Sequence, residues 1–186
     1  MTLYLVGFIH VLAITGCRGC EIQGVRLADI SREENHNSSG EVFYNMQVNV
    51  AKKRDKTHIR DVVISEGEFM AIMDAHRQYF AKKGCDAKRK YLFCKTKHKF
   101  RDNKIDILTI SRKFKALLKA NGFNSRKSLH ICRNMFVASL KSKGYNSFSI
   151  KEIMKYASTS EIDNVYGLSP ACKIQSDKDI RSSIPL

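Results

Sequence analysis

One stretch of strand-like alternation, set between helical patterns, constrains the fold of this chain more than any other feature. Apolar residues occupy every second position from residue 42 to residue 50, which predicts a half-buried strand. Residues 59–64 predict a second strand, and the charged segment 52–56 predicts the turn of a hairpin between them. Because the flanking patterns have helical spacing, the sequence predicts a mainly α protein with a small antiparallel β-sheet, an α+β fold.

Two helices are predicted before this hairpin. Residues 2–14 form an apolar helix that Gly16 ends, and residues 20–26 form a second, short helix. The polar segment 31–40, which contains the run Asn-Ser-Ser-Gly, predicts a loop that leads into the first strand.

The helices after the hairpin are predicted mainly from capping residues. Ser65 and Glu68 form a capping box that starts one helix, and Asp106 caps another that ends before Gly122. A further helix begins near Ser128, and its expected buried residues are Leu129, Met135, Phe136 and Leu140. Two more capping boxes predict the last helices, and they are formed by Ser149 with Glu152 and by Ser158 with Glu161.

The charge of the chain points to a polyanionic partner. Lys and Arg number 33 against 18 Asp and Glu, so the formal net charge is +15. Nucleic acid and a membrane surface both attract such a chain. The basic residues are spread along the sequence rather than gathered in a terminal tail, which favours a folded face that binds nucleic acid.

The sequence predicts neither a targeting signal nor an internal linker. The apolar residues 2–14 follow no Lys or Arg and are too short to cross a membrane, which favours a buried helix. Both Pro lie beyond Tyr166, which predicts one domain over residues 1–166 and a tail at 167–186. We expect a chain that is not secreted, or a fragment of a longer protein.

The six cysteines do not predict a metal site. Cys17 and Cys20 have C-x-x-C spacing, but no second pair completes the ligand set of a zinc site. We therefore expect free, buried thiols, with no metal and no cofactor.

The residues with the clearest chemistry lie between Ser128 and Tyr166. His130 and Arg133 are three residues apart on a predicted helix, so they share one face and can address one ligand. Tyr166 follows on a separate short helix. A basic chain that directs His, Arg and Tyr to one place suggests phosphodiester chemistry on nucleic acid.

Two motifs resemble those of the tyrosine recombinases, the family of phage and transposon integrases and of Xer and Cre-type resolvases. The segment HICRNMF, with His130 and Arg133, resembles the family's H-x-x-R box, although Asn134 replaces a common His. The segment TGCRGCEIQGVRLADI resembles its first arginine box, and the matching residues are Thr15, Gly16, Arg18, Glu21, Leu27, Asp29 and Ile30. The family's last helices match at Gly144, Tyr156 and Tyr166, although the family usually has His or Trp in place of Tyr156.

This resemblance implies a catalytic role for each matching residue. Arg18 and Arg133 would clamp the phosphate, and Tyr166 would attack phosphorus to form a 3′-phosphotyrosine. Lys53, with Lys52 as the near alternative, would give a proton to the leaving 5′ oxygen. The remaining two assist: His130 would handle protons on the attacking side or bind a phosphate oxygen, and Tyr156 would donate a hydrogen bond.

The resemblance also implies partners and leaves alternatives open. Double-stranded DNA would be the substrate, a homo-oligomer (a tetramer on DNA) the working form, and the cytoplasm, nucleoid or nucleus the compartment. The core-binding domain of full-length recombinases is expected to be absent, and the tail 167–186 would assist assembly. A type IB topoisomerase and an inactive, integrase-derived DNA-binding module remain the alternatives to a metal- and ATP-independent recombinase.

Overall fold

The computed structural model describes residues 3–34, 40–50, 58–81, 90–95, 104–156, 158–160 and 162–163. The chain divides into two compact units, Met1–Met135 and Phe136–Leu186. Lys52, Lys53 and Tyr166 lie outside the described residues. The prediction of one domain over residues 1–166 stays a prediction.

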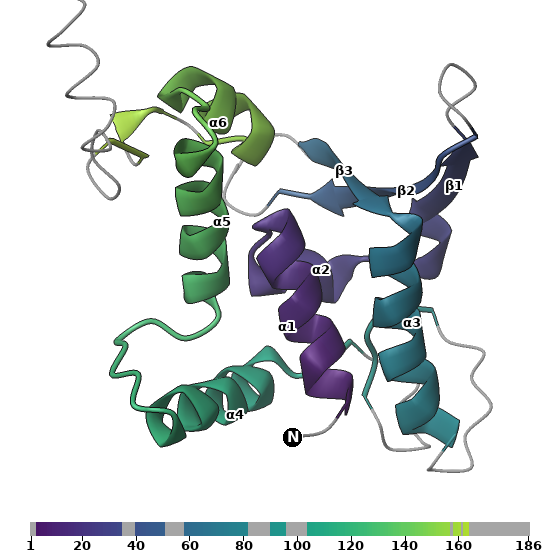
Figure 1. Cartoon of the computed structure of the whole chain (residues 1–186). Helices are drawn as coiled ribbons and strands as arrows, with labels where there is room; N and C mark the ends of the chain where they lie inside the picture. Colours follow the sequence, from purple (N-terminus) through teal and green to yellow (C-terminus); the bar gives the residue numbers. More distant parts are fainter. Residues whose placement is uncertain are drawn as a thin grey trace, which may run out of the picture. The chain divides into compact units, whose positions relative to one another are not determined.

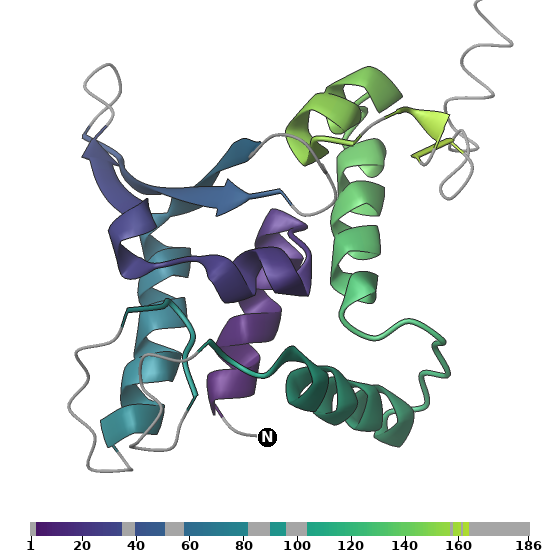
Figure 2. The ribbon, with the colours of Figure 1, turned by 180° about the vertical axis from the view of Figure 1, so that it is seen from behind.

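The first unit is built on two neighbouring helices, α1 (Leu3–Thr15) and α3 (Glu66–Ala81), which pack side by side (Figures 1 and 2). The helix predicted over residues 2–14 is confirmed as α1, and its Phe8 is fully buried. The Phe8 ring meets the Phe93 ring edge to face, with ring centres 5.1 Å apart. The capping box before α3 is also confirmed, since the Ser65 hydroxyl donates to Glu68 Oε2 at 2.7 Å.

A three-stranded antiparallel sheet packs against these helices (Figure 1). Its strands are β1 (Ile30–Glu34), β2 (Val42–Asn49) and β3 (Ile59–Ser65), in that order. Both strands of the predicted hairpin are confirmed, and Met46 pairs with Val62 in their register. Side chains alternate along β3 between the buried and the exposed face. The sheet therefore has one face on the core and one open face.

Strand β1 corrects the loop predicted over residues 31–40. Residues Ile30–Glu34 pair antiparallel with β2, and all but Ile30 are exposed. An exposed strand at the edge of a sheet needs no apolar alternation, so the periodicity that reveals a half-buried strand is missing here.

Two further helices complete the first unit: α2 (Gly19–Gly24), with a 3₁₀ turn at Leu27–Asp29, and α4 (Ile107–Ala120). The predicted cap of α4 is confirmed, because Asp106 accepts hydrogen bonds from the Leu108 N–H at 3.1 Å and from the Thr109 hydroxyl at 2.5 Å. These bonds hold the pKa of the Asp106 carboxyl below its ordinary value, the Thr109 hydroxyl contributing most.

Helix α5 (His130–Ser142) leads from the first unit into the second, which also contains α6 (Ser147–Met154). Among the described residues of the second unit, Val137, Ile150, Met154 and Ile162 form a buried core. Two predictions are wrong here. Met135 is 64% exposed rather than buried. Asn146, rather than Ser149, caps α6, because the Asn146 side chain accepts a bond from the Ser149 N–H at 2.8 Å.

None of the helices in the described part of the chain is long and apolar enough to cross a membrane.

The stability of the first unit should depend strongly on the contact between Phe8 and Phe93. We expect Phe8→Ala to lower the free energy of unfolding by about 3–5 kcal/mol, because it leaves a cavity at a fully buried site. Val6→Ala on the same helix is the control. Val6 is 39% exposed, and the expected loss is under about 0.5 kcal/mol. Urea denaturation measures both values, and equal losses would contradict the prediction.

Candidate active site

The site is organised around the turn that follows α1, residues 15–18, which we call the arginine turn. Gly16 has φ = 63°, a left-handed conformation that glycine adopts without steric cost. Its N–H donates to the Leu12 carbonyl at 3.0 Å. The Thr15 hydroxyl donates to the Val11 carbonyl at 2.6 Å and accepts from the Cys17 N–H at 3.2 Å. Residues 15–17 are buried, so the backbone that leads to Arg18 has a fixed path.

Arg18 is held by Glu21, as the i, i+3 spacing predicts. Arg18 Nη1 lies 2.8 Å from Glu21 Oε1, and the Arg18 backbone N–H donates to Glu21 Oε2 at 2.7 Å. The Glu21 side chain is 2% exposed and the Arg18 side chain 17%. A buried carboxylate thus orients a guanidinium that still reaches the surface.

Arg133 reaches the same turn from α5. Its Nη1 donates to the Gly16 carbonyl at 2.8 Å, and the residue is 1% exposed. Glycine at position 19 allows close packing against Leu129, because an added Cβ would lie only 3.2 Å from Leu129 Cδ1. The structure therefore brings Arg18 and Arg133, far apart in sequence, to one turn. His130 is the first residue of α5, one helical turn before Arg133, and is exposed.

A third arginine at this turn was not predicted. Arg60 of β3 is 5% exposed, and its Nη2 donates to the Thr15 carbonyl. The sequence contains a signal for it. Arg60 shares the phase of Val62 and Ile64 on the strand, and an arginine on the apolar face of a strand needs a buried partner.

Positive charge exceeds negative charge around the arginine turn. In the described part of the chain, the guanidinium groups of Arg18, Arg60 and Arg133 and the carboxylate of Glu21 lie there, with formal charge 3 − 1 = +2. Burial raises the pKa of the Cys17 thiol, while Arg60, a hydrogen bond from Thr15 and Arg133 act in the opposite direction. A fixed group of guanidinium donors suits an oxyanion such as phosphate.

Three other residues predicted for the site lie outside the described part of the first unit. Lys53 and Tyr166 lie outside the described residues. Tyr156 follows α6 in the second unit, where it is half-buried beside that unit's core and its N–H donates to the Lys151 carbonyl at 3.0 Å. The roles of all three stay predictions. No group of three or more His, Cys, Asp or Glu among the described residues is arranged to hold a metal ion.

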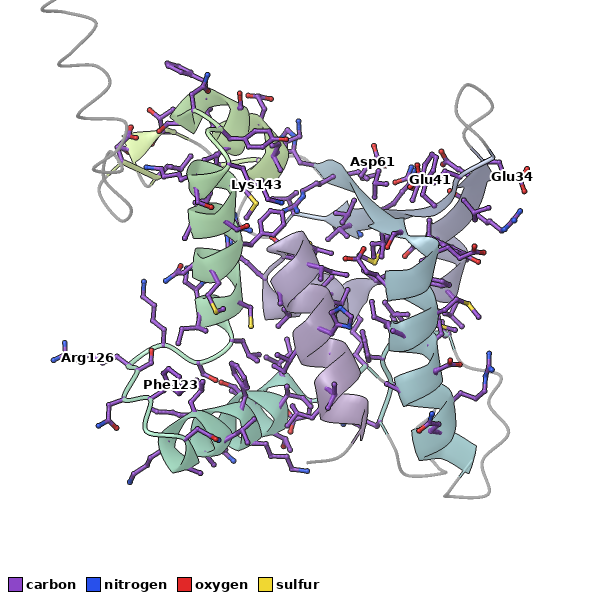
Figure 3. All side chains as sticks on the ribbon, viewed as in Figure 1. Glu34, Glu41, Asp61, Phe123, Arg126 and Lys143 are labelled. Atoms are coloured by element: carbon purple, nitrogen blue, oxygen red, sulfur yellow. The ribbon has the colours of Figure 1, made fainter. Side chains whose placement is uncertain are left out.

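Acidic and basic side chains are unevenly distributed among the described residues of the first unit. Exposed carboxylates lie on the sheet and at its β1–β2 end, including Glu34, Glu41 and Asp61 (Figure 3). In contrast, residues 107–135 of this unit contain seven Lys or Arg and no Asp or Glu, and the segment 107–151, which continues into the second unit, contains ten Lys or Arg and no Asp or Glu. The exposed ones on α4 and in the segment before α5 are Arg112, Lys113, Lys115, Lys119, Arg126 and Lys127. In Figures 1 and 2 the sheet and α4 lie at opposite ends of this unit.

The fold matches solved structures of recombinases. The XerH site-specific recombinase bound to its difH substrate, in a pre-cleavage complex, superposes with a TM-score of 0.69 at 14% identity over 94% of this chain. The XerA recombinase gives 0.62 at 22% identity over 96%. The Tn1549 transposon integrase, in complex with a circular intermediate DNA, gives 0.59 at 17% identity over 93%. The α+β fold predicted from the sequence is therefore the catalytic fold of tyrosine recombinases.

The family itself follows from the sequence match. The model of the phage integrase family matches residues 2–169, and the chain belongs to this family. No curated protein sequence matches the chain significantly. The chain spans 46% of the XerH structure and 57% of the XerA and Tn1549 integrase structures.

The two cysteines of the C-x-x-C segment should differ sharply in reactivity. Cys17 is buried with a raised pKa, so little thiolate forms at neutral pH, whereas Cys20 is exposed. We expect iodoacetamide to modify Cys20 in the folded protein at pH 7–8 and to spare Cys17. Peptide mass spectrometry measures the extent of modification at each cysteine, and labelling in denaturant is the control. Equal rates in the folded protein would show that the arginine turn is open.

Proposed function

We propose that this chain is the catalytic part of a site-specific DNA recombinase that cleaves and rejoins strands through a 3′-phosphotyrosine. The observation that carries this proposal is the meeting of Arg18 and Arg133 at the arginine turn. Membership of the phage integrase family supports it, as does the fold shared with XerH, XerA and the Tn1549 integrase.

The two arginines would act on the phosphate itself. A guanidinium presents planar donors that match two phosphate oxygens and keeps its charge at every physiological pH. Glu21 holds Arg18 from one side, and the Gly16 carbonyl holds Arg133. Donors fixed before the reaction stabilise the charge that develops on the non-bridging oxygens, which is often the largest catalytic contribution.

Tyr166, Lys53 and His130 would carry out the nucleophilic attack and the proton transfers. The Tyr166 oxygen attacks phosphorus, the bond from phosphorus to the 5′ oxygen breaks, and Lys53 gives a proton to that oxygen. His130 receives the phenol proton or holds a phosphate oxygen, and Tyr156 donates a hydrogen bond. Because the phosphodiester energy is kept in the phosphotyrosine, a 5′ hydroxyl can reverse the step without ATP. This scheme also requires no metal.

Double-stranded DNA is the proposed partner, and a homo-oligomer on DNA is the proposed working form. The segment 107–151, which is basic and contains no Asp or Glu, supports DNA as the partner. The XerH and Tn1549 structures, each in complex with DNA, support it as well. The protein would therefore work in the compartment that holds its DNA target.

The nucleophile can be tested with a pool of duplexes that carry a nick and randomised sequence around it. Cleavage near a nick releases a short oligonucleotide, so rejoining fails and the covalent complex accumulates. We expect a covalent protein–DNA band with the wild-type chain and none with Tyr166→Phe. Tyr145→Phe is the control because Tyr145 is 47% exposed, and it should keep the band.

The same experiment distinguishes the alternatives. DNA binding without any covalent band would contradict the recombinase proposal and identify a binding module. Relaxation of supercoiled plasmid by the isolated monomer, without strand exchange between duplexes, would instead identify a topoisomerase. Sequencing the captured duplexes would give the target.

DNA affinity should depend steeply on salt. If about six phosphates are contacted, the affinity falls about 10³-fold between 50 and 200 mM salt. Replacing Lys113 and Lys115 of α4 by Gln should reduce the slope of log affinity against log salt by about 1 for each lost contact. Arg32→Gln on β1 is the control and should leave the slope unchanged. A flat salt response of the wild-type chain would exclude DNA as the ligand.

A further inference from the structure

Arg60 is a buried charged residue to which the proposed reaction assigns no role. It lies on the core face of β3, directly opposite Val48 of β2, which is 1% exposed. Its sequence neighbour Asp61 points away from the helices on the open face of the sheet (Figure 3). Removing a guanidinium from water is costly, so a buried arginine requires a specific acceptor.

That acceptor is the last residue of α1. The carbonyls in the final turn of a helix lack partners within the helix, and they form the negative end of its dipole. Arg60 donates to the Thr15 carbonyl and Arg133 to the Gly16 carbonyl. Strand β3 thus holds the Thr15 carbonyl through Arg60, and helix α5 holds the Gly16 carbonyl through Arg133. Both carbonyls lie in the arginine turn, just before Arg18.

We propose that Arg60 is a positioning residue for strand cleavage: it fixes the Thr15 carbonyl, and with it the backbone that aims Arg18 at the phosphate held with Arg133. The inference rests on the proposed function. Arg60 also begins the core-facing part of β3, the strand that follows the segment with Lys53. Through Arg60, the hairpin and the arginine turn are coupled by one hydrogen bond.

A positioning role predicts a loss in the rate of cleavage rather than in DNA affinity. We expect Arg60→Met to lower the single-turnover cleavage rate at saturating DNA about 100-fold, the effect of a displacement of about 1 Å at a reacting centre. The dissociation constant for DNA should change less than about threefold. Arg60→Lys, whose ammonium can donate to the same carbonyl, should restore the rate at least about tenfold.

The matched control is Arg32→Met. Arg32 is an exposed arginine of the same sheet and pairs with Glu34. The Arg32→Met variant should cleave DNA at the wild-type rate. The substrate is the nicked duplex selected by the wild-type chain. Circular dichroism gives the folded fraction of each variant, and rates are compared per folded molecule. If Arg60→Met does not fold, Arg60→Gln takes its place in the comparison with Arg60→Lys.

A second measurement needs no DNA. If Arg60 holds the arginine turn, Arg60→Met should increase the rate at which iodoacetamide modifies Cys17 in the folded protein, and Arg60→Lys and Arg32→Met should not. Cys17 lies in this turn, and Arg60 lowers the pKa of its thiol. Loss of the Arg60 charge alone would therefore slow the modification, so a faster reaction reports opening of the turn. Unchanged protection of Cys17 in Arg60→Met would overturn the inference.

The cleavage results separate this inference from the proposed function. A wild-type chain without a covalent complex refutes the proposed function. A wild-type chain that cleaves, together with an Arg60→Met variant that cleaves within about twofold of it, refutes only the positioning role. Equal losses in Arg60→Met and Arg60→Lys, or a loss of DNA affinity that matches the loss of rate, would also refute it.

Discussion

Two buried guanidinium groups on successive backbone carbonyls are the interaction on which the rest of this site depends. Arg60 and Arg133 donate to Thr15 and Gly16, where α1 ends and the chain turns toward Arg18. Hydrogen bonds to charged groups contribute about 1.5–3 kcal/mol each, and the carbonyls of a helix end are good acceptors for cations. These bonds offset the cost of burying the arginines, and they join a helix, a strand and a turn that are distant in sequence.

Much of the first unit could be predicted from local patterns. Alternation revealed β2 and β3, and the caps Ser65 and Asp106 revealed the starts of α3 and α4, because these signals arise from neighbouring residues. The edge strand β1 was missed because an exposed strand buries no periodic face. Met135 was misplaced because apolar composition alone does not determine which side of α5 packs on the core.

The candidate site was predictable where its contacts are local. The ion pair of Arg18 with Glu21 follows from i, i+3 spacing on a short helix. The convergence of Arg18 and Arg133 was expected from the family resemblance, since periodicity carries no information about contacts between distant segments. Arg60 shows the same limit: the strand pattern gives the face on which it lies, but not the helix end 45 residues away that accepts its hydrogen bond.

The uneven charge of the described residues in the first unit affects its encounter with a polyanion. Among these residues, exposed carboxylates are concentrated on the sheet, and basic side chains cover α4 and the segment before α5. Such a distribution is an electric dipole, and the field of a nucleic acid exerts a torque on it during diffusion. Attraction by these basic side chains therefore raises the fraction of collisions that begin with α4 and the segment before α5 turned toward the phosphates.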